Sequence, residues 1–114
     1  MTAGIYDIVI EQGATFTLNA TWKDSAGAPV NLTGYSARMQ VRPSYESEEI
    51  LASLVSPTNI VLGGALGTIV ATIPATDTQK LNIQEGVYDL ELEIGGVVTR
   101  LLQGKATISW EVTR

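Results

Sequence analysis

Apolar and polar residues alternate with a period of two along most of the chain, which is the pattern of β-strands that bury one face. The alternation is clearest in four runs, with apolar positions at Phe16, Leu18, Ala20 and Trp22, at Tyr35, Ala37, Met39 and Val41, at Tyr88, Leu90, Leu92 and Ile94, and at Ala106, Ile108, Trp110 and Val112. Shorter candidate strands span residues 5–10, 50–55, 68–73 and 97–102, and turn-forming residues separate them. About eight strands predict an all-β fold, a single antiparallel β-sandwich.

Residues 74–81 form the one stretch with a helical pattern. Thr76 and Gln79 have the spacing of a capping box, and Asp77 lies where the helix dipole favours an acid. The pattern predicts one short helical crossover between two strands. Because no linker, repeat or low-complexity tract interrupts the sequence, residues 1–114 are expected to form one β-sandwich domain.

Gly95 and Gly96 predict a two-residue hairpin loop that sets the register of the strands beside it. In this register the facing pairs are Ile94 and Val97, Leu92 and Thr99, Glu91 and Arg100, and Leu90 and Leu101. Opposite charges across a ladder contribute at most about 1 kcal/mol, but they oppose a slip by one residue. Glu91 and Arg100 are therefore interpreted as a register pair.

The apolar strand faces supply the expected core of the sandwich: Phe16, Leu18, Trp22, Tyr35, Met39, Leu90, Leu92, Ile108 and Trp110. Replacing Trp22 or Trp110 by Ala is expected to cost about 3 to 5 kcal/mol, which is large for a marginally stable domain. The last strand, residues 105–113, carries only two charges and no proline, so we expect it to lie inside its sheet and not at an edge.

The absence of Cys and His removes most familiar enzyme chemistry. It excludes disulfides, thiolate nucleophiles, Ser/His pairs and Cys/His zinc sites, so we expect no enzyme activity, no cofactor and no metal site. The 12 acidic and 7 basic residues give a net charge of -5. Nucleic acid is therefore not an expected partner, because phosphate binding needs an excess of Lys and Arg.

Residues 50–76 contain no charged side chain and need to be tested as a membrane span. Pro57 and the Gly63, Gly64 and Gly67 positions divide the segment into pieces far shorter than the roughly 20 apolar residues that cross a bilayer. Two strands and a glycine turn are the preferred interpretation, and no membrane partner is expected. Residues 1–7 contain neither a basic segment nor an apolar run, so no signal peptide is expected.

Three acids, Asp89, Glu91 and Glu93, share one face of a predicted strand. They could supply ligands to Ca²⁺ or the two carboxylates of a glycosidase. A straight row with roughly 7 Å between side chains neither surrounds an ion nor faces a substrate from two sides. A solvated outer face, partly neutralised by Arg100, is the preferred interpretation.

One cluster could contact another protein. Tyr45 is the single aromatic residue outside any strand pattern, and it lies near Arg38, Arg42 and Glu46. We predict that these four residues form the candidate interface. Attachment is expected to use the loop of residues 42–49, with Tyr45 at the contact, and the free sheet edges other than the last strand. Only 17% of the residues are charged, against about 25% in an average domain, which also favours a surface that meets protein.

Three segments resemble a known family. A "G-x-T-F" motif at residues 13–16 leads into the first clear strand, and a "G-x-P-V-N-L-T-G-Y" turn leads to Tyr35. A "Y-D-L" strand at residues 88–90 precedes a "G-K-A-T-I" strand at residues 104–108. The same order of pieces is similar to the immunoglobulin-like N-terminal domain of tailed-bacteriophage baseplate upper proteins. The resemblance implies an immunoglobulin-like sandwich without a catalytic motif. It covers nearly the whole chain.

The resemblance implies a non-enzymatic structural or adaptor subunit of a tailed-phage virion, in the tail or baseplate region. Expected partners are other virion proteins in a symmetric homo- or hetero-oligomeric assembly, and the expected location is the virion, after synthesis in the host cytoplasm. Two alternatives stay open: a capsid decoration protein and a receptor- or carbohydrate-binding module. A carbohydrate site would need exposed aromatic rings, and the sequence pattern assigns most of them to the core.

Overall fold

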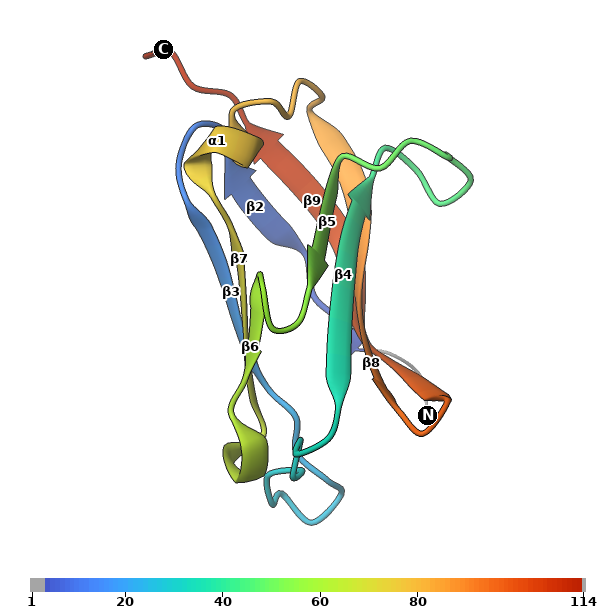
Figure 1. The fold of residues 1–114 in the computed structure, drawn as a ribbon. Helices are drawn as coiled ribbons and strands as arrows, with labels where there is room; N and C mark the ends of the chain where they lie inside the picture. The colour runs from blue at the N-terminus through green and yellow to red at the C-terminus, as the bar shows by residue number, and fades with distance from the viewer. Residues whose placement is uncertain (1–3, 114) are drawn as a thin grey trace.

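The computed structural model describes residues 4–113, which form two β-sheets packed face to face (Figure 1). The elements in chain order are β1 (Gly4–Ile5), β2 (Ile8–Glu11), β3 (Phe16–Thr21), β4 (Ser36–Arg42), β5 (Ala52–Val55), β6 (Ile60–Leu62), a 3-10 turn (Gly64–Leu66), β7 (Thr68–Ile73), α1 (Ala75–Thr78), β8 (Glu85–Ile94) and β9 (Val97–Ser109). The all-β sandwich predicted from the alternation is confirmed. Residues 1–3, on which the expectation about a signal peptide partly depends, and Arg114 lie outside the described residues.

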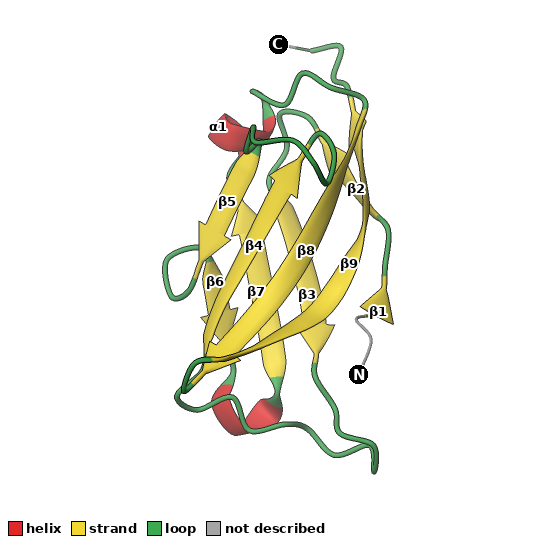
Figure 2. Cartoon of the chain, turned by 90° about the vertical axis from the view of Figure 1, so that its right-hand side faces the viewer, coloured by secondary structure: helices red, strands yellow, loops and turns green. Residues whose placement is uncertain are grey.

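The larger sheet has the strand order β1-β9-β8-β4-β5, with β2 also pairing with β9, and the smaller sheet has the order β3-β7-β6. Figure 2 shows the two layers, with β4, β8 and β9 in front of β3, β6 and β7. All pairs are antiparallel except those of β1 and β2, which run parallel to β9. The expected interior position of the last strand is confirmed, because β9 lies between β8 and the β1–β2 edge.

The described residues contain nine strands instead of about eight. The first predicted strand is divided into β1 and β2, and the last two predicted strands are one continuous strand, β9. Strand β6 adds a strand inside the uncharged segment, which was expected to hold two. No helix of the described residues is long and apolar enough to cross a membrane.

The core lies between the sheets and contains most of the predicted residues. Leu18, Met39, Leu90, Leu92 and Ile108 are buried, whereas Phe16, Trp22 and Tyr35 are partly buried and pack against the core. The Trp22 and Tyr35 rings meet edge to face, with centroids 5.7 Å apart, an arrangement that aromatic quadrupoles favour.

The prediction of a buried Trp110 is wrong, because this side chain is 55% exposed. It has the same parity as Ile108, but β9 ends at Ser109 and not at residue 113 as predicted. The last pair between β9 and β8 involves Thr107, and the last pair with β2 involves Ser109. Position 110 therefore lies beyond the last rung of the sheet, and its side chain is not enclosed by the core.

The β8–β9 hairpin keeps the predicted register only near its turn. Glu91 faces Arg100 as predicted, but Leu90 faces Leu102 and not Leu101, because a bulge interrupts the ladder there. A bulge places one extra residue in one strand and so changes which side chains face inward. After the bulge, Ala106 and Ile108 face the core together with the even-numbered residues of β8.

Between β1 and β2, the backbone at Tyr6 passes close to Gly104 of β9. A Cβ at position 104 would lie 2.5 Å from the Tyr6 carbonyl oxygen, so only glycine leaves room for this crossing. The Tyr6 N–H donates to the Gln103 carbonyl at 2.9 Å, and the Asp7 carboxylate accepts the Lys105 N–H at 3.0 Å. The Tyr88 hydroxyl, opposite Gly104 in the ladder, donates to the Tyr6 carbonyl. These contacts fix the edge strand to the sheet.

The short predicted helix is present as α1, with Asp77 in its first turn as expected. The predicted capping box is wrong: the N-cap residue is Pro74, and no side chain caps the helix. The buried Thr78 hydroxyl instead donates to the Ala14 carbonyl at 2.8 Å and accepts the Gly13 N–H at 3.1 Å. Helix α1 is therefore held by hydrogen bonds to the turn after β2, and not by a side chain that caps its own N-terminus.

Candidate functional site

The predicted contact cluster lies on the outer face of the larger sheet. Residues of one parity on β4 and β8 point away from the core, and the ladder places Arg38 opposite Glu91, Gln40 opposite Asp89, and Arg42 opposite Val87. Arg100 of β9 joins the same face opposite Glu91. A hollow of about 300 Å³ is bordered by these strands and by the loop after β4; its lining residues are Gln40, Arg42, Tyr45, Val87, Tyr88, Asp89, Glu91 and Arg100.

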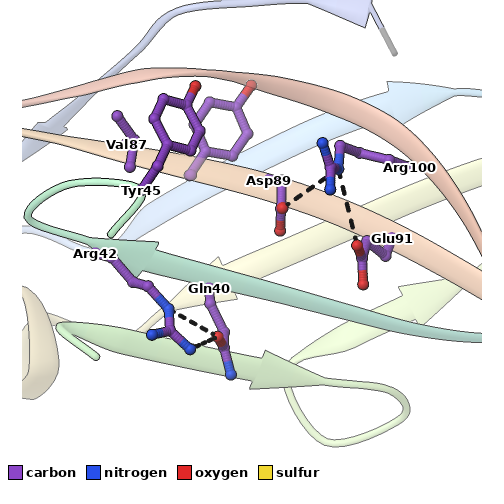
Figure 3. A pocket seen from close by; sticks show the side chains of 8 residues that line it. Gln40, Arg42, Tyr45, Val87, Asp89, Glu91 and Arg100 are labelled. Carbon is purple, nitrogen blue, oxygen red and sulfur yellow. Dashed lines mark hydrogen bonds and ion pairs between the residues drawn. The ribbon is translucent and has the colours of Figure 1, made fainter. Parts of the chain in front are cut away.

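The charges on this face form a connected network. Glu91 accepts from the Arg38 guanidinium at 2.9 Å and lies 3.8 Å from that of Arg100, which is also 3.5 Å from the Asp89 carboxylate. Figure 3 shows Arg100 reaching from β9 toward both carboxylates. Burial raises the pKa of Asp89, and the nearby Glu91 charge adds to this while the Arg100 guanidinium opposes it. Since both arginines are about half exposed, each pair contributes at most about 1 kcal/mol.

Arg42 organises the loop that carries Tyr45. Its guanidinium donates to the Ser47 carbonyl at 2.8 Å and to the Gln40 side-chain oxygen at 2.9 Å. Figure 3 shows the second of these contacts, with Arg42 turned toward Gln40 of the same strand. Arg42, the last residue of β4, therefore positions the loop that carries Tyr45, because its guanidinium binds the backbone at Ser47 on the other side of Tyr45.

Tyr45 is the exposed aromatic element of the site. Its side chain is 66% exposed and borders the hollow beside Val87 (Figure 3). The structure thus brings Arg42 and Tyr45 together at one hollow, and Arg38 reaches it through Glu91. Glu46 is exposed in the loop but does not line the hollow. Whether these four residues contact another protein stays a prediction.

The acidic row is better explained as part of this network than as a reactive site. Asp89 and Glu91 share an arginine, and Glu93 accepts the Ser36 hydroxyl and the Gly96 N–H. Within residues 4–113, no group of three His, Cys, Asp or Glu side chains could hold a metal ion. A face that carries both signs of charge and one exposed ring is suited to specific contact with a polar protein surface.

The sheet edges provide a second set of contact features. Strands β3, β5 and β6 lie at the borders of the sheets, where each has one edge without a partner strand among residues 4–113. None of the three contains a charged residue or a proline. Val55 and Val61, on two of these strands, are 47% and 61% exposed. Uncharged edges present unpaired N–H and C=O groups to which a strand of another protein can pair.

Sequence reasoning missed the exposed Trp110. Its indole N–H donates to the Ile83 carbonyl at 2.8 Å, and the ring borders a separate hollow at the end of the sandwich. The period-two pattern predicts which face a residue shares, but it does not predict where the opposing strand stops.

Comparison with known proteins identifies the fold. The solved N-terminal domain of phage TP901-1 ORF48 is similar to this chain with a TM-score of 0.55 and 12% sequence identity, covering 96% of this chain and 99% of that domain. A structure of the extracellular domain of the voltage-gated sodium channel β4 subunit gives a TM-score of 0.46 at 12% identity and covers 98% and 97% of the two chains. No family model matches the sequence, and no curated protein matches it.

Proposed function

We propose that this chain is a non-enzymatic structural or adaptor subunit of a tailed-phage virion, in its tail or baseplate region. The observation that carries the proposal is the likeness to the phage ORF48 domain, which spans nearly the whole of both chains. A match limited to one pair of strands would cover only a small part of the two chains, whereas this match covers 96% of this chain and 99% of that domain. The four sequence motifs described above support the same assignment.

The surface supports a role in assembly. Three uncharged sheet edges and one exposed tyrosine beside a mixed-charge hollow offer two means of attachment, strand pairing and side-chain docking. Virion neighbours form closed rings, so a subunit that docks on them is repeated by the symmetry of the ring. The proposed partners are therefore ring-forming virion proteins.

The proposal is tested by counting the chain in purified particles of the phage that encodes it. Quantitative mass spectrometry against the major capsid protein measures the number of copies per particle. An adaptor is expected in a small multiple of three or six. Hundreds of copies would support a capsid decoration protein instead, and absence from washed particles would overturn both virion roles.

The proposed contact at Tyr45 is tested separately with a matched pair of variants. Tyr45→Ala and Leu66→Ala each remove an exposed apolar side chain, 66% and 69% exposed respectively, and both should fold with a stability within about 0.5 kcal/mol of the original. Leu66 lies in the 3-10 turn at the other end of the sandwich from the Tyr45 loop. We expect Tyr45→Ala to be incorporated less well into particles and Leu66→Ala normally. Equal incorporation of Tyr45→Ala and the original chain would refute a contact at Tyr45.

A further inference from the structure

Three segments that are distant in sequence meet around Trp110. They are the turn after β2, the stretch between α1 and β8, and the segment after β9, which lie at the same end of the sandwich in Figure 1. They border a hollow of about 540 Å³ lined by Gln12, Gln79, Lys80, Asn82, Trp110 and Glu111. This volume lies within the range of small-ligand sites in proteins.

Hydrogen bonds hold the walls of this hollow in place. The Gln12 amide donates to the Leu81 carbonyl at 2.8 Å and accepts the Glu111 N–H at 3.1 Å, so one side chain joins all three segments. The missing side chain of Gly13 leaves space for the Glu111 carboxylate, which a Cβ would approach to 2.0 Å. The site is therefore built before any ligand arrives, which lowers the entropic cost of binding.

The indole of Trp110 is held in one orientation while much of its surface remains accessible. Its N–H donates to the Ile83 carbonyl at 2.8 Å, yet the side chain is 55% exposed. With its single donor already satisfied, the surface that the ring offers to a ligand is carbon only. An apolar ring surface of this kind packs against the C–H face of a sugar ring.

Two of the other lining residues, Gln79 and Asn82, have the chemistry that sugar hydroxyls require, and Lys80 and Glu111 add one basic and one acidic residue to the lining. A hydroxyl group both donates and accepts hydrogen bonds, and the amide side chains of Gln79 and Asn82 do the same. Both residues are exposed at the rim of the hollow. No aliphatic side chain lines it, in contrast to the well-packed apolar pockets that receive hot-spot residues in protein interfaces.

We infer that this hollow binds a neutral saccharide, with one pyranose ring against the indole of Trp110 and its hydroxyls hydrogen-bonded to Gln79 and Asn82. The site is separate from the Tyr45 face and does not depend on the proposed virion role. An open site with one aromatic ring is expected to bind weakly, with a dissociation constant of roughly 1 to 10 mM. Repetition of the subunit in a symmetric assembly would strengthen such binding through avidity.

The inference is tested by nuclear magnetic resonance on the ¹⁵N-labelled 114-residue chain. Glucose, galactose, rhamnose and N-acetylglucosamine are each titrated to about 50 mM, well above the expected dissociation constant. The chain has two Trp residues, so the Trp22 indole signal serves as an internal control. We expect at least one sugar to shift the Trp110 indole signal and the backbone amides of residues 79–82 with saturation, while the Trp22 signal stays unchanged.

Variants of the lining residues separate binding from folding. Trp110→Ala should abolish the saturable shift of residues 79–82, and Asn82→Ala, which keeps the ring, should weaken binding about fivefold, the loss expected for one neutral hydrogen bond. Tyr45→Ala is the matched control, with an aromatic ring removed from the other face, and should bind as the original does. Absence of a saturable shift for all four sugars, or undiminished binding by Trp110→Ala, would overturn the inference. If the original chain binds none of the four sugars and the Trp110→Ala variant is not incorporated into particles, the Trp110 ring makes a protein contact instead.

Discussion

The hydrogen bond between Tyr88 and the Tyr6 carbonyl predicts that the effect of Tyr88→Phe on stability depends on pH. Tyr88 is 2% exposed, and its hydroxyl donates a hydrogen bond to the Tyr6 carbonyl in the segment between β1 and β2. Phe keeps the ring but leaves the Tyr6 carbonyl without this donor. At pH 7 the substitution should lower the free energy of unfolding by about 1 to 2 kcal/mol.

The sign of the pH effect follows from the pKa of the hydroxyl. Burial raises the pKa of Tyr88 from its ordinary 10.0 to about 12, and the nearby Tyr6 and Asp7 charges add to the increase. Because the folded-state pKa exceeds the unfolded one, this contribution is complete below pH 10 and is lost as the pH rises through 12. The complete loss amounts to roughly 3 kcal/mol, of which about 2 kcal/mol is lost by pH 11.5. Phe cannot ionise, so the advantage of the original chain should fall to about zero there.

Urea unfolding of both proteins, followed by far-ultraviolet circular dichroism at pH values from 7 to 11.5, measures this difference. Comparing the two proteins at each pH cancels the Lys and Tyr residues that titrate in both. The reasoning predicts a constant difference up to about pH 10, which is the unperturbed tyrosine pKa, and a steady decrease above it. A difference that stays constant to pH 11.5, or that grows with pH, would refute the assigned burial and hydrogen bond of Tyr88.

Two further substitutions test the fold. Gly104→Val places atoms where the Tyr6 carbonyl lies, so it should cost about 1 to 3 kcal/mol and speed hydrogen exchange at the Tyr6 and Lys105 amides; unchanged exchange there would contradict the close crossing. Trp22→Ala removes a ring that packs against the core and should cost about 3 kcal/mol in urea unfolding, whereas Trp110→Ala should cost no more than about half of that because the ring is 55% exposed. Equal costs for the two tryptophans would contradict the positions assigned to them.

The alternation of apolar residues predicts the layers of this fold, because each strand must turn one face to the other sheet. The parity of the pattern also contains information about the bulge. The inward-facing residues are even-numbered on both strands, with Leu90 and Leu92 on β8 and Ala106 and Ile108 on β9. Two even-numbered residues can face each other only in a register in which the numbers of paired residues sum to an even value. A tight turn at Gly95 and Gly96 gives an odd sum, so one extra residue has to be inserted between the turn and Ala106.

Other features depend on contacts that no local pattern contains. The exposure of Trp110 follows from where β2 and β8 stop, and the role of Arg42 follows from the path of its loop back to Ser47. Strand β6 is only three residues long, and it is a strand because its backbone pairs with that of β7. For the candidate site, strand parity places Arg38 and Arg42 on the same face of β4, and chain proximity brings Tyr45 to the hollow that Arg42 lines, whereas Glu46 does not line it. A contact of these four residues with another protein stays a prediction.

Electron microscopy of purified particles tests the proposed role most directly. A map of the tail and baseplate at side-chain resolution would show whether density for this two-sheet sandwich is present and which surfaces meet its neighbours. We predict density in ring symmetry at the tail or baseplate, with the Tyr45 loop or an uncharged edge, β3, β5 or β6, against a ring-forming protein. Density on the capsid surface, or a tail-bound domain whose Tyr45 loop and three edges all face solvent, would contradict the proposed mode of assembly.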